Sequence, residues 1–235
     1  MTYLFDPAAA EKRRNDIRYA QRFRMSKLVD GVREVDWSQL TNAVHAAGAP
    51  APLAGASLKM FFDSNHKVDV ADALAEMVRG ESDKYGVVLS GRPRTGKTSI
   101  AIAAMRYALR HGNCVRFVSY EEYLRLLQRR LDIQKSGSTG DEYLSLMEEW
   151  EQERYDLERV YDLLVVDDYA RITAPEFFTQ DFHTLLRHRY DAGLYTIVVS
   201  NLSREQLREV MNERLSAFLR SEFRQFGFDE ASRIA

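Results

Sequence analysis

The octapeptide at residues 91–98, GRPRTGKT, is the segment whose residue types and spacing most clearly indicate chemistry. It follows a short apolar run at residues 86–90 and precedes a stretch with helical apolar spacing. Strand, loop and helix therefore come in the order of a Walker A phosphate loop, whose backbone N–H groups and helix dipole attract phosphate oxygens. We expect nucleotide to contact Gly91, Arg92, Pro93, Arg94, Thr95, Gly96, Lys97, Thr98 and Ser99.

Three side chains of this loop have distinct expected roles. Lys97 supplies an ammonium group for the outer phosphates, and Thr98 supplies a hydroxyl for Mg²⁺. Arg94 lies where such loops often carry glycine. Either its backbone is not left-handed, or the fold tolerates about 1 kcal/mol of strain at this position.

A second polar pair follows a later apolar run, DLLVVDD at residues 162–168. This pattern is typical of a Walker B strand, because ligands gather at the carboxyl ends of strands in open α/β sheets. Asp167 would hold Mg²⁺, directly or through water, and Asp168 would polarise the attacking water. Two solvated aspartates at a strand end are the alternative, which the upstream phosphate loop makes the weaker one.

Two further signals are less specific. Ser200 and Asn201 end a buried strand, where the Asn201 amide can orient water or touch the γ-phosphate. The same residues could form only a turn, with Ser203 as the N-cap of the next helix. Arg214 lies on a later helix and is a candidate arginine finger for a nucleotide on a neighbouring subunit, although a solvated helical arginine is the plainer interpretation.

The bulk composition limits the class of protein. The chain has 235 residues, a formal net charge of −2 and a single cysteine, Cys114, which we interpret as a buried small hydrophobic residue. The net charge means that contact with nucleic acid needs a local basic patch. No disulfide or thiolate metal site can be built, and no signal core or membrane-spanning stretch is present, so we expect a cytoplasmic protein.

The rest of the chain alternates strands and helices. Near-continuous apolar strands separated by helices predict an α/β fold with a parallel sheet covered on both faces. We expect a helical N-terminal region and linker over residues 1–57 and the nucleotide-binding domain over residues 58–235. The expected strands are residues 86–90, 114–119, 162–168 and 194–201, with a short last strand at 223–228. The expected helices are residues 11–33, 35–47, 69–79, 97–110, 120–131, 141–160, 179–190 and those within 204–219.

Together these signals resemble the DnaC/IstB-like branch of the AAA+ ATPases. The resemblance runs from about Phe61 to Arg220, and its most specific stretches are LSGRPRTGKTSIAIAAM, DLLVVDDY and HRYDAGLYTIVVSNLSREQL. The last stretch, with Arg189 and Tyr190 before the strand, looks like the first sensor region of that family. The resemblance implies a P-loop AAA+ core without a helical lid, ATP and Mg²⁺ as cofactors, and slow ATP hydrolysis between subunits assembled on DNA.

Carried over residue by residue, the resemblance makes Lys97 and Thr98 the ligands of phosphate and magnesium, Asp167 and Asp168 the Walker B acids, Asn201 the sensor and Arg214 the finger. There are two departures. Arg94 replaces a usual glycine, and Phe218 stands where the family often has a second arginine, with Arg220 nearby but out of step.

Four functions remain open from the sequence. The first is an ATPase that loads a hexameric replicative helicase onto single-stranded DNA and self-associates into a ring or spiral. The second is a transposition helper ATPase of the IstB type with a transposase partner. The others are a small-molecule kinase, which would need a basic lid, and a binding module that uses ATP as a switch.

Three surfaces are assigned only in outline. The basic run over residues 12–27 could touch DNA phosphates, grip the helicase, or form a solvated helix face. Arg129, Arg130 and Lys135 are possible but unremarkable contacts for single-stranded DNA. The family resemblance alone implies that residues 61–66 would line the adenine pocket.

Overall fold

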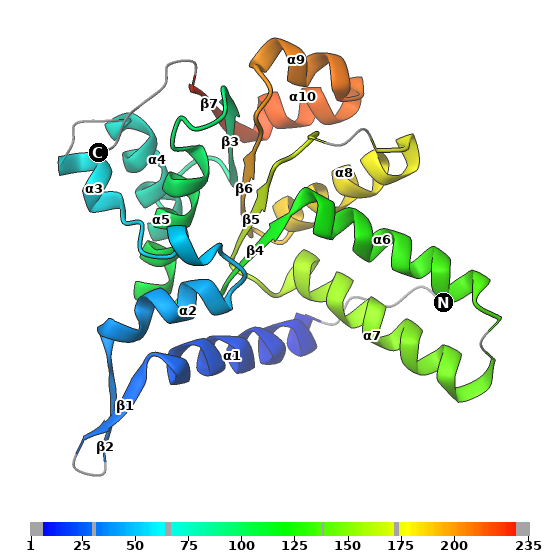
Figure 1. The fold of residues 1–235 in the computed structure, drawn as a ribbon, viewed down its shortest axis with the longest axis horizontal. Coiled ribbons are helices and arrows are strands. Elements are labelled where there is room, and N and C mark those ends of the chain that lie inside the picture. Colours follow the sequence, from blue (N-terminus) through cyan, green and yellow to red (C-terminus); the bar gives the residue numbers. More distant parts are fainter. Residues whose placement is uncertain (1–6, 30–31, 64–66, 138, 172–173, 229–235) are drawn as a thin grey trace.

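The computed structural model describes residues 7–29, 32–63, 67–137, 139–171 and 174–228. A parallel five-stranded sheet forms the centre, in the order β4-β5-β6-β3-β7, with helices on both faces (Figure 1). The strands are β3 (Gly86–Gly91), β4 (Val115–Ser119), β5 (Leu163–Asp167), β6 (Tyr195–Val199) and β7 (Phe223–Phe228). The fold class predicted from the sequence is confirmed, including the short last strand, which pairs with β3.

Alternate residues of each strand enter two different cores, as the two-residue period of a strand requires. Val87 and Leu89 of β3 enter a core with the helices on one face, whereas Val88 between them enters the core on the other face. Because both faces are apolar, the strands appear in the sequence as unbroken apolar runs rather than as alternating ones.

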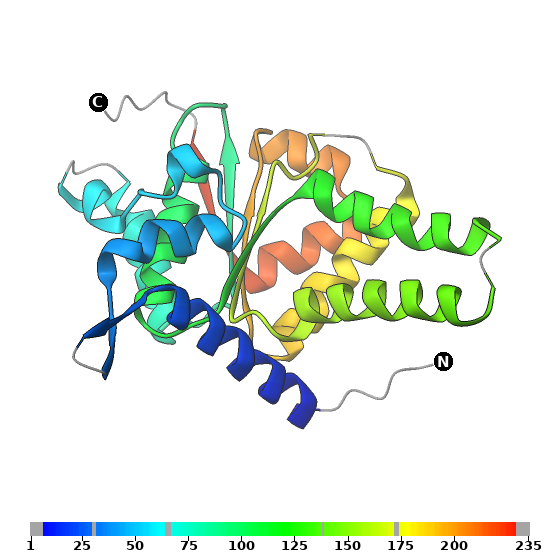
Figure 2. The same cartoon turned by 60° about the horizontal axis from the view of Figure 1, so that its bottom comes forward.

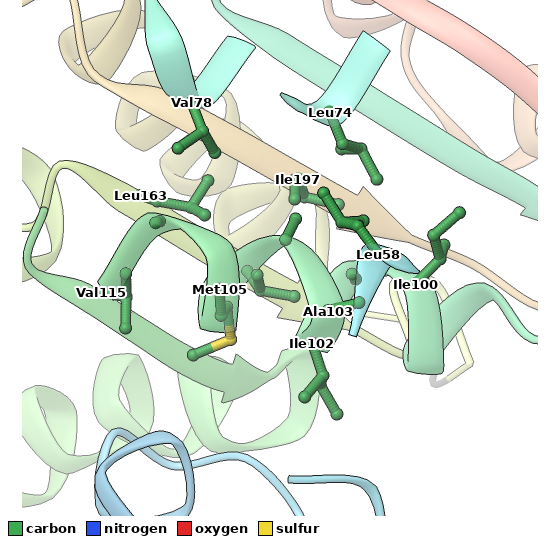
Figure 3. Close-up of a cluster of buried hydrophobic side chains, with 14 of the residues drawn as sticks. Leu58, Leu74, Val78, Ile100, Ile102, Ala103, Met105, Val115, Leu163 and Ile197 are labelled. Carbon is green, nitrogen blue, oxygen red and sulfur yellow. The ribbon is translucent and has the colours of Figure 1, made fainter. Parts of the chain in front are cut away.

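The first core is covered by α2 (Leu40–Ala46), α3 (Leu58–Asp63), α4 (Val68–Arg79) and α5 (Lys97–Arg110). Figure 3 shows part of this core, where Leu74 and Val78 of α4 and Ile100 and Met105 of α5 pack with Leu163 and Ile197 of the sheet. α4 begins after Lys67 and ends at Gly80, which has a φ of 75° and caps the helix in the left-handed region.

The second core is covered by α6 (Tyr120–Lys135), α7 (Gly140–Arg159), α8 (Glu176–Asp191), α9 (Arg204–Val210) and α10 (Glu213–Glu222). α6 and α7 form a long antiparallel pair between β4 and β5 that extends from the body of the molecule (Figure 1). α9 and α10 follow β6, and no helical lid domain follows β7 within the part of the chain that the structure describes.

The N-terminal region differs from the sequence prediction. A helix over residues 11–33 was expected, but α1 (Pro7–Arg24) ends at Arg24 and a hairpin of β1 (Ser26–Val29) and β2 (Val32–Val35) follows (Figure 2). β-branched and apolar residues on either side of an Asp-Gly pair favour a hairpin over a helix. The turn itself lies outside the described residues.

The helix expected over residues 35–47 is likewise shorter. A 3₁₀ turn, η1 (Trp37–Gln39), precedes α2, and the Asp36 side chain caps η1 by accepting from the Ser38 amide at 3.0 Å. A second 3₁₀ turn, η2 (Ala51–Leu53), lies within the expected linker. Ala49 and Ala54 are fully buried in the first core, so this segment packs against the nucleotide-binding fold rather than hanging free.

The N-terminal region also covers the outer edge of β4. The Gln21 side chain donates to the Val115 carbonyl at 2.9 Å and accepts from the Val115 amide at 3.2 Å, as a neighbouring strand would. The Phe117 amide donates to the Ala47 carbonyl at 2.8 Å. These bonds satisfy backbone groups that an edge strand otherwise leaves open.

A nucleotide site at the carboxyl end of the sheet

The phosphate loop connects β3 to α5 and carries two glycines for identifiable reasons. Gly91 has a φ of 127°, and a Cβ atom there would lie 2.4 Å from the Phe228 carbonyl oxygen. Gly96 has a φ of 90° and is the N-cap of α5. Arg94 has a φ of 62°, so its backbone is left-handed and the fold does tolerate the expected strain. The exposed side chains of the loop are those of Arg92, Pro93 and Arg94.

The first turn of α5 presents unpaired amides. Within the described chain, no protein acceptor is recorded for the backbone N–H groups of Thr95, Gly96, Lys97 and Thr98, whereas the Ile100 amide already donates to the Gly96 carbonyl. Such N–H groups, with the positive end of the helix dipole, form an anion-binding site. These four amides are free for phosphate, whereas the amides of Gly91 and Arg92 already donate to the carbonyls of Leu202 and Phe228.

Lys97 is buried, with its side chain folded over the loop. Its Nζ donates to the carbonyl oxygens of Gly91 at 2.9 Å and Arg92 at 2.5 Å, and to the Thr95 hydroxyl at 3.3 Å. Burial lowers the pKa of Lys97, and the carboxylates of Asp167 and Asp168 oppose that decrease. To reach a phosphate, the ammonium must exchange these neutral oxygens for charged ones, which bind it more strongly.

Thr98 and Asp167 come together although they lie on different elements. The Thr98 hydroxyl donates to the Asp167 carboxylate at 3.3 Å. Burial raises the pKa of Asp167, and hydrogen bonds from the Asp168 amide and the Thr98 hydroxyl oppose the rise. A hydroxyl and a carboxylate at this separation could hold Mg²⁺, which prefers one or two protein oxygens together with phosphate oxygens and waters.

Asp168 is held by two neighbours. The Asn201 amide donates to one carboxylate oxygen at 2.7 Å, and Arg171 donates to the other at 3.2 Å. Asp168 has a φ of 55° and lies in the left-handed region, like Arg94. Since β6 lies between β3 and β5, the sheet order itself places Asn201 between the phosphate loop and the Walker B acids.

Arg171 was missed from the sequence, because a lone exposed arginine after a Walker B strand carries no pattern. Ser200 has a structural role in the fold, since its hydroxyl donates to the Tyr169 carbonyl at 2.8 Å and its amide to the Leu89 carbonyl at 2.8 Å. Ser203 is the N-cap of α9, as the alternative interpretation held, in a capping box with Gln206.

Arg189 is fully buried and binds neutral oxygens from three elements. It donates to Thr196, to the carbonyls of Leu157 and Tyr161, and to that of Tyr195, at 2.6–2.9 Å. Burial lowers the pKa of Arg189 to about 9. The residue therefore joins α7, α8 and β6 within the fold.

Arg214 does not join the cluster. It is exposed on the first turn of α10, and within the described residues its charge acts on His183 of α8, lowering the pKa of that imidazole together with burial and Arg187. Arg214 is thus available on the surface, and its role as a finger stays a prediction.

Several basic side chains of the N-terminal helix form ion pairs and hydrogen bonds within the protein, so they are not all free to contact DNA or a partner. Arg13 binds Asp156 at 2.9 Å and Arg18 binds Asp162 at 2.7 Å. Arg14 donates to the carbonyls of Arg159 and Val160, at the end of α7. Cys114 is buried as predicted, and burial with the adjacent Asp162 carboxylate raises the pKa of its thiol to about 12.

A P-loop strand, a Walker B strand and a sensor strand between them, in a parallel sheet of this order, define a P-loop ATPase of the AAA+ class. A family model described as "IstB-like ATP binding protein" matches residues 63–219, which is more than half of the chain. The protein belongs to this family of ATP-binding proteins, and the DnaC/IstB-like resemblance found in the sequence is confirmed. No curated protein matches the chain.

Solved structures share the fold. A putative primosome component from Streptococcus pyogenes serotype M3 is 18% identical, with a TM-score of 0.57, over 81% of this chain and 97% of its own. DnaI is 18% identical, with a TM-score of 0.55, over 77% of this chain and 92% of its own. AMPPCP-bound DnaA from Aquifex aeolicus is 19% identical, with a TM-score of 0.53, over 68% of this chain and 45% of its own.

The chain thus spans about half the length of the AMPPCP-bound DnaA structures that it matches, 45% of one and 47% of another. None of the described helices is both long and apolar enough to cross a membrane. In the same residues no cluster of three or more histidines, cysteines or acids could hold a metal ion by itself.

Proposed function

We propose that this protein is an ATP-hydrolysing AAA+ protein that loads a hexameric replicative DNA helicase onto single-stranded DNA. The single observation that carries the ATPase part is the convergence of Thr98, Asp167, Asp168 and Asn201 from three neighbouring strand ends. In the proposed reaction, Lys97 and the loop amides bind the phosphates, and Thr98 and Asp167 would hold Mg²⁺. Asp168 accepts a proton from a water oriented by Asn201 as the water oxygen bonds to the γ-phosphorus, and the bond from that phosphorus to the bridging oxygen breaks to release ADP. Bound Mg²⁺ would offset negative charge on the phosphates.

The exposed position of Arg214 supports hydrolysis between subunits. An arginine finger neutralises charge that develops on the transferred phosphoryl group, and it can come from a neighbouring chain. Self-association into a ring or spiral would place Arg214 of one copy beside the phosphate loop of the next. Hydrolysis by the isolated subunit is then slow, and assembly on DNA stimulates it.

The helicase-loading part has support from the extent of the structural matches. The chain covers 92% of DnaI, 97% of the primosome component and 90% of the solved structure named as the DnaC helicase loader, at TM-scores between 0.51 and 0.57. The α6–α7 pair replaces the basic lid that a small-molecule kinase would need, which makes that function the least supported.

A transposition helper of the IstB type is the second candidate, and the name of the matching family favours it. The two functions differ in substrate. A loader prefers single-stranded DNA and binds a helicase, whereas a helper prefers long duplexes and binds a transposase. The net charge of −2 is modest for a protein that would coat duplex DNA.

The test is a loading assay with the replicative helicase of the host and single-stranded DNA covered by binding protein. We expect ATP-dependent loading with the wild type and none with Lys97→Met. Loading that survives in Asp168→Asn, while hydrolysis is lost, would show that ATP acts as a switch. If no helicase complex forms under any nucleotide condition and the protein binds long duplexes, the helicase-loading function is wrong and the transposition-helper function is favoured.

A further inference from the structure

A groove of about 460 Å³ lies at the end of the sheet opposite the phosphate loop. Residues of α1, β2, η1, the last turn of α5 and the loop after it line the groove. Figure 2 shows α1 and the hairpin beside the end of α5. Among the described residues that line it, every charged side chain is basic. The side chains that matter for its chemistry are Arg18, Tyr19, Arg22, Trp37, Arg110 and His111.

Large aromatic side chains are exposed along this groove. Tyr19 is 69% exposed and Trp37 45% exposed, and Phe23, 44% exposed, lies next to Tyr19 with 6.0 Å between ring centroids. The guanidinium of Arg110 lies 5.5 Å from the Trp37 ring centroid. Exposed aromatic faces beside arginines provide stacking surfaces for rings of a ligand.

The positive charge of the groove is not fully neutralised by the protein. Arg18 is paired with Asp162 and Glu11, whereas Arg22 and Arg110 form no ion pair with a carboxylate within the described residues. The carbonyls of Tyr107, Ala108 and Leu109 in the last turn of α5 already accept from the amides of His111, Gly112 and Asn113. An anion at this helix end therefore meets free guanidinium groups rather than bare carbonyl oxygens.

We propose that this groove binds single-stranded nucleic acid, with backbone phosphates at Arg22 and Arg110 and unpaired bases stacked on Tyr19 and Trp37. Basic side chains interleaved with exposed aromatic rings are the pattern by which proteins hold single strands without sequence preference. A duplex keeps its bases paired and offers no free ring to Trp37. An acidic peptide would match the charge of the groove but not its aromatic faces.

This inference deepens the proposed function, because it assigns a place on the subunit to the single-stranded DNA on which a loader acts. It adds a contact surface formed by residues that no family motif covers. Since α5 begins at Lys97 and ends at Arg110, one rigid helix connects the nucleotide site to the groove.

Intrinsic tryptophan fluorescence gives a direct readout. The chain has two tryptophans, and Trp150 is buried with its indole N–H donating to the Leu126 carbonyl, so quenching by a stacked base reports on Trp37. We expect (dT)20 added to the nucleotide-free protein to quench the fluorescence with saturation. An equally charged polyglutamate peptide should not quench it.

Variants then locate the site by anisotropy with labelled (dT)20. Trp37→Ala and Arg110→Ala should each weaken binding about tenfold, and Trp37→Phe, which keeps a stacking ring, should stay near the wild type. Arg187→Ala is the matched control. Arg187 is an exposed arginine on α8, outside the groove, and its guanidinium also lies beside an aromatic ring, 5.6 Å from the Phe218 ring centroid. The control variant should change binding by less than about twofold.

Melting curves for each variant separate lost contacts from lost folding. Wild-type affinity in Trp37→Ala and Arg110→Ala, or quenching by polyglutamate in place of (dT)20, would overturn the proposal. The assay contains neither helicase nor ATP, so failure to load a helicase would remove the proposed function and leave this result unchanged. If the groove variants load the helicase normally and bind DNA like the wild type, the proposed role of the groove is wrong and the proposed loader function still stands.

Discussion

The two ends of the parallel sheet differ in how well their polar groups are paired and in how strained their backbone is. At the carboxyl end, the chain holds non-glycine residues in the left-handed region, buries an ammonium group and leaves helix amides unpaired. At the amino end, α1 crosses the strands with reciprocal hydrogen bonds from Gln21 and ion pairs from Arg13 and Arg18. The left-handed residues Arg94 and Asp168 and the unpaired helix amides thus lie at the nucleotide site, while the opposite end contributes stability.

If this contrast is correct, changes at the carboxyl end should affect nucleotide handling far more than folding. Lys97→Met keeps the length of the side chain and removes the buried ammonium. We expect about a 100-fold loss of ATP affinity by calorimetry, since buried charged contacts carry large binding free energies. The melting temperature should not fall, because the substitution also removes a charge whose burial costs stability.

The control for this change is Lys12→Met, which removes an exposed lysine from α1 at the other end of the molecule. It should leave ATP affinity unchanged. An equal loss in both variants would mean that the affinity depends on overall charge rather than on the phosphate loop.

Changes at the amino end should show the reverse. Gln21→Ala leaves the amide and carbonyl of Val115 without partners at the edge of β4. We expect the free energy of unfolding to fall by about 2 kcal/mol, seen as a melting temperature lower by roughly 4–8 °C. ATP affinity should remain within twofold. A stable Gln21→Ala protein would show that water satisfies these groups as well as the side chain does.

A smaller change tests the strain at Arg94. Arg94→Gly relieves about 1 kcal/mol of left-handed strain but gives the unfolded chain more freedom, so we expect a net gain of about 0.5 kcal/mol. Arg92→Gly is the matched comparison, because Arg92 does not have a positive φ and can only lose stability. Opposite signs in thermal melts would confirm the strain, and equal signs would contradict it.

The smallest effect on stability concerns the pH dependence of Asp167. Because its pKa is raised in the folded protein, ionising it costs stability at neutral pH, and this cost disappears when the carboxyl is protonated in both states. Asp167→Asn should therefore raise the melting temperature at pH 7.5 and lose that advantage as the pH falls below the raised pKa. Unchanged stability at every pH would show that hydrogen bonds fully offset the burial. Turnover of ATP should be lost.

The sequence predicted the carboxyl end better than the amino end, for a physical reason. The phosphate loop, the acids after β5 and Asn201 lie within short segments whose apolar runs define the strands, and parallel strands bring their carboxyl ends to one edge. The contacts of Arg171 with Asp168, and the left-handed backbone of Asp168, follow from local geometry that no spacing pattern encodes.

At the amino end, the partners are far apart in the chain. Arg18 meets Asp162 and Gln21 meets Val115, so the basic face of α1 could not be separated from a solvated one by its own pattern. The helical spacing of apolar residues also continued into the hairpin, which hid the end of α1 at Arg24. The contact between Trp37 and Arg110 likewise could not be predicted, because the two residues are far apart in the sequence and only the fold brings them together.

The Gln21 side chain that imitates a strand has a practical consequence for anyone who trims this protein. A fragment that begins near residue 58, where the ATPase domain was expected to start, would lose both Gln21 and Ala47 and present the bare edge of β4 to solvent. Bare edges of this kind recruit strands from other molecules. Such a fragment would therefore precipitate or form adventitious oligomers, and its apparent assembly state would say nothing about the ring or spiral of the intact chain.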